Sequence, residues 1–128
     1  MTAPAGRRVL AVVPDLFFAT RIAATAKAAG VEFELVPRER AAARAGESRP
    51  SLLVLDLHTR DAVTLVTALK AAAPETPLVG FFSHVETELR RDALAAGADA
   101  VLPRSQFTVK LAELLTWGLS AIRARETP

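Results

Sequence analysis

The sequence SLLVLDL, residues 51–57, is a short apolar run interrupted by one carboxylate, Asp56. A run of this length is too short for a typical helix, and it is typical of a strand buried on both faces of a parallel sheet. Residues 8–13 (RVLAVV) and 78–82 (LVGFF) have the same character. The three runs therefore predict inner strands of a sheet that helices cover on both sides.

Helical patterns separate these strands. Residues 16–29 carry an apolar stripe at helical spacing, Asp15 can cap the start of this helix, and Gly30 can end it. Strand and helix alternate five times, which favours parallel strands joined by helical crossovers. By the same reasoning we expect further strands at 31–36 and 100–102. We also expect a helix at 39–46, a helix that ends at Ala73, a helix at about 85–96 and a last helix from Phe107 to Ile122.

Composition limits the function classes. The 128 residues are 51% hydrophobic and 23% charged, and we expect one globular domain over residues 1–128 with its core at about 8–122. The lack of cysteine excludes disulfides, cysteine zinc sites and thiol nucleophiles. The 16 basic and 14 acidic residues are interleaved, which argues against a nucleic-acid surface. Because the sequence has no apolar stretch of about 20 residues, we expect a soluble, cytoplasmic protein with no membrane partner.

In open parallel sheets, ligands bind at the carboxyl ends of the strands. The residues that follow each predicted strand are therefore the candidates for a functional site. They are Pro14, Asp15, Val36, Pro37, Asp56, His58, Phe82, Ser83, His84, Pro103, Arg104 and Ser105.

Four segments together resemble the receiver domain of bacterial two-component response regulators. They are VLAVVPD at 9–15, SLLVLDL at 51–57, PLVGFFS at 77–83 and GADAVLPRSQF at 97–107. The resemblance extends from Arg8 to about Ile122. It implies a flavodoxin-like α/β fold, with a doubly wound five-stranded parallel sheet in the order 2-1-3-4-5.

The resemblance also implies a site and its chemistry. Asp56 would be the phosphoacceptor, and its carboxylate would attack phosphorus to give an acyl phosphate. Magnesium would be held by Asp15, by Asp56 and by the backbone carbonyl of His58, and it would neutralise charge during the transfer. Arg104 and Ser83 would bind the phosphoryl group.

This chain departs from the family pattern in three places. Pro14 stands where the family has a second acidic residue, so we expect magnesium binding to be weak or absent. Phe82 aligns with the family's hydroxyl residue, and Ser83 replaces it only if the chain turns there. Arg104 replaces a lysine, and Ser105 replaces the proline that usually follows it.

Other interpretations stay open for these residues. Asp56 can form a structural ion pair with Arg104, because a buried unpaired charge is costly. Asp15 can simply cap a helix, and Ser83 can do the same with Glu86.

Four phenylalanines lie near the expected site. Phe17 and Phe18 follow the first strand, while Phe81 and Phe82 end the fourth. One hypothesis is that their rings crowd and partly plug the pocket, which would exclude a hydrated metal. The alternative is that they are ordinary core residues.

The resulting hypothesis is a stand-alone, atypical receiver that relays a signal by protein contact. The resemblance implies a histidine kinase or phosphotransfer protein as donor, a downstream protein target, and a contact surface on the fourth helix, fifth strand and fifth helix. The alternatives are a phosphorylation-independent interaction module and a small hydrolase, although the chain lacks a GxSxG elbow. The candidate contact residues, for a target or a homodimer, are Arg90, Arg91, Asp92, Lys110, Glu113 and Trp117.

Overall fold

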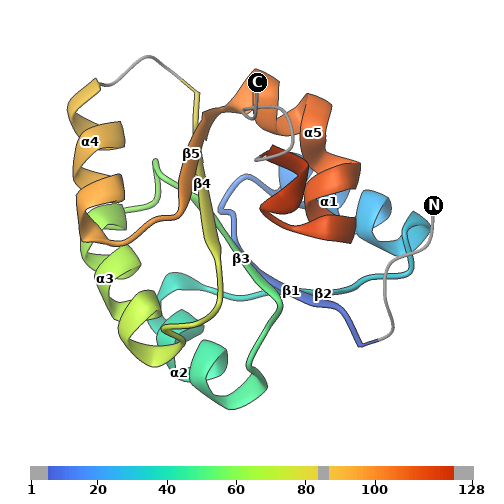
Figure 1. Cartoon of the computed structure of the whole chain (residues 1–128), viewed down its shortest axis with the longest axis horizontal. Helices are drawn as coiled ribbons and strands as arrows, with labels where there is room; N and C mark the ends of the chain where they lie inside the picture. Colours follow the sequence, from blue (N-terminus) through green and yellow to red (C-terminus); the bar gives the residue numbers. More distant parts are fainter. Residues whose placement is uncertain (1–5, 84–86, 123–128) are drawn as a thin grey trace.

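A computed structural model describes residues 6–83 and 87–122 and contains one five-stranded parallel sheet. The strand order is β2-β1-β3-β4-β5 (Figure 1), which confirms the predicted order. The strands are β1 (Arg8–Val12), β2 (Glu32–Leu35), β3 (Leu52–Asp56), β4 (Leu78–Phe82) and β5 (Ala100–Pro103). The helices are α1 (Leu16–Ala28), α2 (Arg38–Ser48), α3 (Ala62–Ala72), α4 (Thr87–Ala96) and α5 (Arg104–Trp117). Within the two described ranges, no helix has the length and apolar character needed to cross a bilayer.

The sheet separates two apolar layers. Helices α1 and α5 cover one face, and α2, α3 and α4 cover the other (Figure 1). Every residue of β3 is buried, and its side chains alternate between the layers, with Val54 on the α1 and α5 side and Leu53 and Leu55 on the opposite side. The continuous apolar run at 51–57 is therefore explained by burial on both faces.

The first helix forms as predicted. Asp15 is its N-cap, and its Oδ1 atom accepts hydrogen bonds from the backbone N–H groups of Phe17 and Phe18 at 3.0 and 3.2 Å. The buried side of α1 includes Ile22. Gly30 follows the helix with a φ of 73°, a conformation that glycine adopts without a Cβ penalty.

Helix α2 is longer than the predicted 39–46 segment and does not end at Gly46. A Cβ at this glycine would lie 3.6 Å from the backbone oxygen of Ala72, so the position lies where α2 comes close to the end of α3. The helix ends instead at Ser48, and its C-cap Arg49 adopts the left-handed conformation with a φ of 47°. Gly46 is therefore an interhelical contact position.

The expected continuous helix to Ile122 is wrong, because α5 ends at Trp117. Gly118 follows with a φ of 66°, and residues 120–122 form a separate helical turn. The Arg7 side chain donates from Nε to the backbone oxygen of Leu115 at 2.7 Å, which ties the chain before β1 to this helix end. Helix α4 is described from Thr87, so the proposed pairing of Ser83 with Glu86 lies outside the described residues.

Gly80, in the middle of β4, has no room for a side chain. A Cβ there would lie 3.0 Å from Cγ and Cδ2 of Leu57, the buried residue that follows Asp56. We expect Gly80→Ala to lower the free energy of unfolding by roughly 1–3 kcal/mol, because overpacking forces Leu57 to move. Chemical denaturation monitored by circular dichroism measures this change.

Gly46→Ala is the matched control for Gly80→Ala. It adds the same methyl group in a helix, at ordinary contact distance from its neighbours. The expected result is a free energy of unfolding that is unchanged or raised by up to about 1 kcal/mol. If Gly80→Ala and the unchanged protein unfolded at the same denaturant concentration, the argument that Leu57 must move would be contradicted.

Candidate functional site

The candidate residues lie at the carboxyl edge of the sheet, where parallel strands end together. Strands β1 and β3 are direct neighbours, with Val12 paired to Leu55, so Asp15 and Asp56 follow adjacent positions. Strand β5 ends beside β4, and α5 begins immediately after it at Arg104. The order of the strands therefore brings these three segments to one edge although they lie far apart in the sequence.

Asp56 is the last residue of β3 and is 8% exposed. Its Oδ1 atom accepts a hydrogen bond from the backbone N–H of His58 at 2.9 Å. Among the residues that the structure describes, no basic side chain forms an ion pair with this carboxylate. A nearly buried carboxylate without a cationic partner is costly to desolvate, and such groups are often found at functional sites.

Asp15 has contacts to both of its carboxylate oxygens. Oδ1 caps α1 as described above, and Oδ2 accepts from Nη2 of Arg104 at 3.2 Å. The hydrogen bond from the Phe18 backbone is the main cause that lowers the pKa of the Asp15 carboxyl below its usual value, and Arg104 adds to it against an opposing effect of desolvation. The helix-capping interpretation of Asp15 is thus confirmed, and the cap is also an ion-pair partner.

Arg104 contacts two groups of α1. Its guanidinium lies over the ring of Phe18, 3.9 Å from the ring centroid, while Nη2 reaches Asp15. A planar guanidinium can stack on a ring and donate hydrogen bonds at its edge together, which an ammonium group does less well. The alternative hypothesis of an ion pair between Asp56 and Arg104 is wrong, because α1 supplies both partners of the arginine.

His58 and Ser83 connect the segments after β3 and β4. The backbone N–H of Ser83 donates to Nε2 of His58 at 3.0 Å. Phe82 belongs to β4 and is buried in the layer of α2, α3 and α4, whereas Ser83 is exposed directly after the strand. Ser83 thus lies next to the loop that follows Asp56, and its contact to this loop is made by its backbone N–H; the expected role of Ser83 in phosphate binding stays a prediction.

The expected magnesium site stays a prediction, because it needs only the carboxylates of Asp15 and Asp56 and the backbone carbonyl of His58. No group of three acidic or histidine side chains that could hold a metal occurs in residues 6–83 and 87–122. Asp15 is engaged by the first turn of α1 and by Arg104. Hard cations such as Mg²⁺ are bound by oxygen ligands in a near-octahedral arrangement. Arg104 would therefore compete with a metal ion for Oδ2 of Asp15.

The hypothesis that four phenylalanine rings plug the pocket is wrong. Phe17 is 92% exposed and points away from the core. Phe18 and Phe81 are buried with Phe107 in the layer of α1 and α5, where the rings of Phe81 and Phe107 stack with centroids 4.7 Å apart. Phe82 lies in the opposite layer. Phe18 still contributes to the site, because its ring supports Arg104.

The expected contact surface on α4, β5 and α5 is only partly present. Arg91 is exposed and pairs with Asp92 at 3.6 Å, and Trp117 is 46% exposed. Lys110 is 4% exposed, so the expectation that it lies on this surface is wrong. Its position on α5, three residues after the buried Phe107, places it on the inward side of the helix.

Sequence reasoning missed two features of the site. One is the contact of the Arg104 guanidinium with the Phe18 ring. The apolar stripe of α1 predicted that Phe18 is buried, but it did not indicate which group packs on the ring. The other is Thr59, whose hydroxyl is buried without a hydrogen-bond partner. The sequence signal that could have drawn attention to Thr59 was its position three residues after Asp56.

The Asp15 contacts predict a specific dependence on pH. Because the pKa of Asp15 is lowered in the folded state, its contribution to stability is fully present above the unfolded value of about 3.9 and is lost as pH falls through the folded-state pKa. We expect Arg104→Gln to raise the pKa of Asp15 while leaving it below the ordinary value, since the Phe18 hydrogen bond remains. Carbon-detected NMR titration of the Asp15 carboxyl measures both values.

Arg21→Gln serves as the control for this titration, because it removes a positive charge from the exposed side of the same helix. The pKa of Asp15 should hardly change in this variant. An equal change in both variants would mean that net charge, and not the contact at 3.2 Å, lowers the pKa.

Comparison with known proteins was made at three levels. No protein family model matches the chain, and no curated protein matches its sequence. Solved structures do match: a response regulator from Hahella chejuensis is 20% identical with a TM-score of 0.77, over 90% of this chain and 96% of that one. The signal receiver domain of the putative response regulator NarL from Mycobacterium tuberculosis is 15% identical with a TM-score of 0.75, over 98% and 100%.

A third similar structure is a response regulator protein from Burkholderia pseudomallei with a phosphorylated aspartic acid, a calcium ion and citrate. It is 18% identical with a TM-score of 0.72, over 95% of this chain and 75% of that one. At these identities the likeness concerns the fold. The chain has the CheY-like, flavodoxin-type fold of response regulator receiver domains.

Proposed function

We propose that this chain is a receiver-type signalling domain of the cytoplasm that accepts a phosphoryl group on Asp56 from a histidine kinase or phosphotransfer protein. The observation that carries the proposal is the Asp56 carboxylate, which ends the central strand of a receiver fold and has no cationic partner among the described residues. The similar Burkholderia pseudomallei structure carries a phosphorylated aspartic acid. Asp56 is the acidic residue of this chain whose position in the fold best suits that role.

The proposed reaction is a phosphoryl transfer. A carboxylate oxygen of Asp56 forms a bond to phosphorus while the bond from phosphorus to the donor nitrogen breaks, and the released imidazole takes a proton from water. The product is an acyl phosphate, which adds negative charge next to Asp56. Arg104 is suited to compensate this charge if its guanidinium turns from Asp15 to the phosphoryl oxygens, which it can bind in a bidentate manner.

The effect of phosphorylation would be transmitted through α1 and through Ser83, directly after β4. Turning Arg104 would remove one hydrogen bond from Asp15 and the stacking contact with Phe18. The new charge on Asp56 would also act on the His58 segment, which contacts Ser83. Arg91 and Trp117, on the exposed side of α4 and α5, are the proposed contacts for a downstream target or a second copy of the chain.

A second candidate function is a phosphorylation-independent interaction module. It is favoured by the contact of Arg104 with both Asp15 and Phe18, which holds the carboxyl edge together without a phosphoryl group. In such a module the conformation is fixed and Asp56 has only a structural role.

Treatment with acetyl phosphate distinguishes the two functions. In the presence of magnesium we expect the intact protein to gain the mass of one phosphoryl group, and hydroxylamine to remove it, because acyl phosphates react with this nucleophile. Asp56→Asn should abolish the gain, since an amide oxygen does not form the acyl phosphate. Intact-protein mass spectrometry and peptide mapping measure the adduct and its position.

Asp61→Asn is the matched control, because it removes an exposed carboxylate five residues further along. Labelling should persist in this variant. Labelling that survives in Asp56→Asn would contradict the assignment of the acceptor. A complete lack of labelling in the unchanged protein, with an intact fold, would favour the interaction module.

The ion pair at Asp15 predicts that Arg104 competes with divalent cations. We expect Arg104→Gln to bind Mn²⁺ several-fold more tightly than the unchanged protein, because it frees Oδ2 of Asp15 and removes a positive charge from the edge. Paramagnetic broadening of the Phe17 and Phe18 amide signals by Mn²⁺ measures this affinity. An unchanged or weaker affinity in Arg104→Gln would contradict competition at Asp15, and Arg21→Gln again controls for net charge.

A further inference from the structure

A pocket of about 490 Å³ lies beside the Asp56 edge, at the carboxyl ends of β1 and β2. It is bounded by the starts of α1 and α2 and by the loop between β3 and α3. Its volume is within the range of about 300–1,000 Å³ that is usual for small-molecule sites. The lining residues are Val12, Val13, Pro14, Leu16, Leu35, Val36, Pro37, Arg38, Glu39, Thr59 and Arg60.

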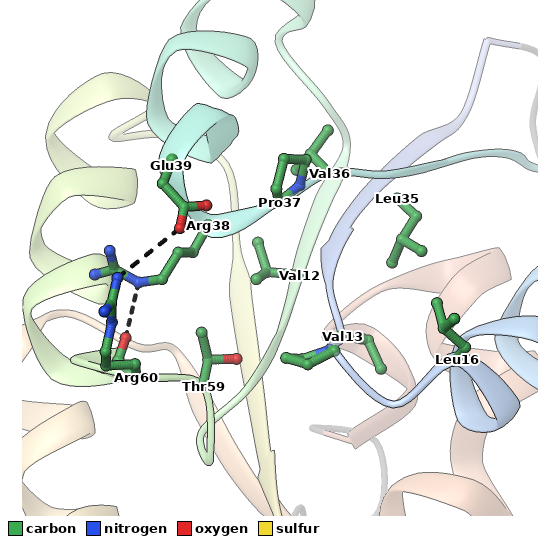
Figure 2. Close-up of a pocket in the computed structure, with 11 residues that line it drawn as sticks. Val12, Val13, Leu16, Leu35, Val36, Pro37, Arg38, Glu39, Thr59 and Arg60 are labelled. Atoms are coloured by element: carbon green, nitrogen blue, oxygen red, sulfur yellow. Dashed lines mark hydrogen bonds and ion pairs between the residues drawn. The ribbon is translucent and has the colours of Figure 1, made fainter.

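The pocket has an apolar end and a polar end. Figure 2 shows Val13, Leu16 and Leu35 on one side, and Arg38 and Arg60 on the other. Leu16 and Leu35 are 69% and 40% exposed, so part of the apolar end is open to solvent. An amphipathic occupant would cover this exposed apolar area and place its polar group among the arginines.

Thr59 supplies the observation that points to a ligand. The residue is 7% exposed, and its Oγ1 atom is buried without a hydrogen-bond partner. In Figure 2 the hydroxyl points from the β3–α3 loop toward Val13, on the wall of the pocket. An unsatisfied buried hydroxyl is destabilising, and an oxygen atom of an occupant would remove this cost by accepting a hydrogen bond once the side chain rotates.

The charges at the polar end favour an anion. Arg38 donates from Nε to the backbone oxygen of Arg60 at 2.8 Å, and Arg60 lies 4.0 Å from Glu39. Two guanidinium groups and one carboxylate leave one net positive charge. Helix α2 also begins at this end of the pocket, so the positive end of its dipole adds to the charge of the two arginines, although Glu39 lies in the same first turn.

We propose that this pocket binds a small organic acid that has an apolar body and one carboxylate. The body packs against Val13, Leu16 and Leu35, and the carboxylate lies beside Arg38 and Arg60. The Thr59 hydroxyl, which now points toward Val13, rotates toward the carboxylate and donates to it. One carboxylate matches the single net positive charge, and the apolar end matches a chain of several carbons. This site is separate from the proposed phosphorylation of Asp56, and its occupancy does not require it.

Octanoate is the probe for the test, with the full chain followed by amide NMR. We expect saturable shifts at the amides of Val13, Leu16, Val36 and Thr59. The isosteric variant Thr59→Val should weaken octanoate binding about threefold to tenfold, because it removes one hydrogen-bond donor. The double variant Arg38→Gln/Arg60→Gln should weaken it about tenfold or more, because it removes both positive charges at the polar end.

Three controls keep the test decisive. Arg21→Gln removes a positive charge elsewhere and should bind octanoate as the unchanged protein does. Octan-1-ol, which lacks the carboxylate, should bind more weakly and should not respond to the arginine substitutions. Asp56→Asn should bind octanoate normally, so failure of the phosphorylation proposal leaves this one intact.

Several outcomes would overturn the proposal. The first is an absence of shifts at these amides with octanoate at about 10 mM, a concentration that would still reveal weak binding. The second is equal binding of octanol and octanoate. The third is undiminished binding of octanoate in the double variant. Native-like amide spectra of Thr59→Val and of the double variant show that any loss arises from the pocket. Shifts centred on another surface would equally exclude the assignment.

Discussion

Burial of β1 and β3 on both faces is the constraint on which the candidate site depends. These neighbouring strands must be covered by helices on each side, so the chain crosses from one strand to the next through a helix each time. All strands then end at the same edge, and the polar residues that follow them are brought together. Asp15 and Asp56 therefore lie at this edge because of the apolar packing of the strands that precede them.

At this edge, one arginine distinguishes the chain from a simple copy of the family pattern. Arg104 follows β5, yet its partners Asp15 and Phe18 both belong to the beginning of α1. The guanidinium therefore links the first and last helices of one layer. Asp56, one strand away, is left without an ion pair among the described residues, and this separation of the two carboxylates is the feature that a phosphoryl donor would exploit.

The sequence predicted the fold well because the deciding signals are local. Apolar runs of five to seven residues, the Asp15 cap and the apolar stripe of α1 each depend on neighbours within a few positions, and strand order followed from the family resemblance. The errors occur where a distant contact overrides a local signal. Gly46 stays within α2 at a close approach to α3, whereas Gly118 ends α5 beside Arg7.

The candidate site was predicted less completely, because its contacts depend on side-chain direction. Position in the sequence placed Asp15, Asp56 and Arg104 at one edge, but the alternative that it left open for Arg104 was an ion pair with Asp56, whereas Arg104 pairs with Asp15. Lys110 was expected on the contact surface that the family resemblance implies for the fifth helix, although its place on α5 turns it inward. Burial of a charged group is decided by the helix face it occupies, and the polar residue type was a poor guide.

The short loop after Asp56 connects the two sites that we propose. The backbone N–H of Thr59 donates to the backbone oxygen of Asp56 at 3.0 Å, and the same residue turns its hydroxyl toward the pocket. A group bound in the pocket and a charge on Asp56 would therefore act on one hydrogen-bonded turn. If one of them changes the position of this turn, the affinity for the other must change by the same factor, since coupling between two binding sites is reciprocal.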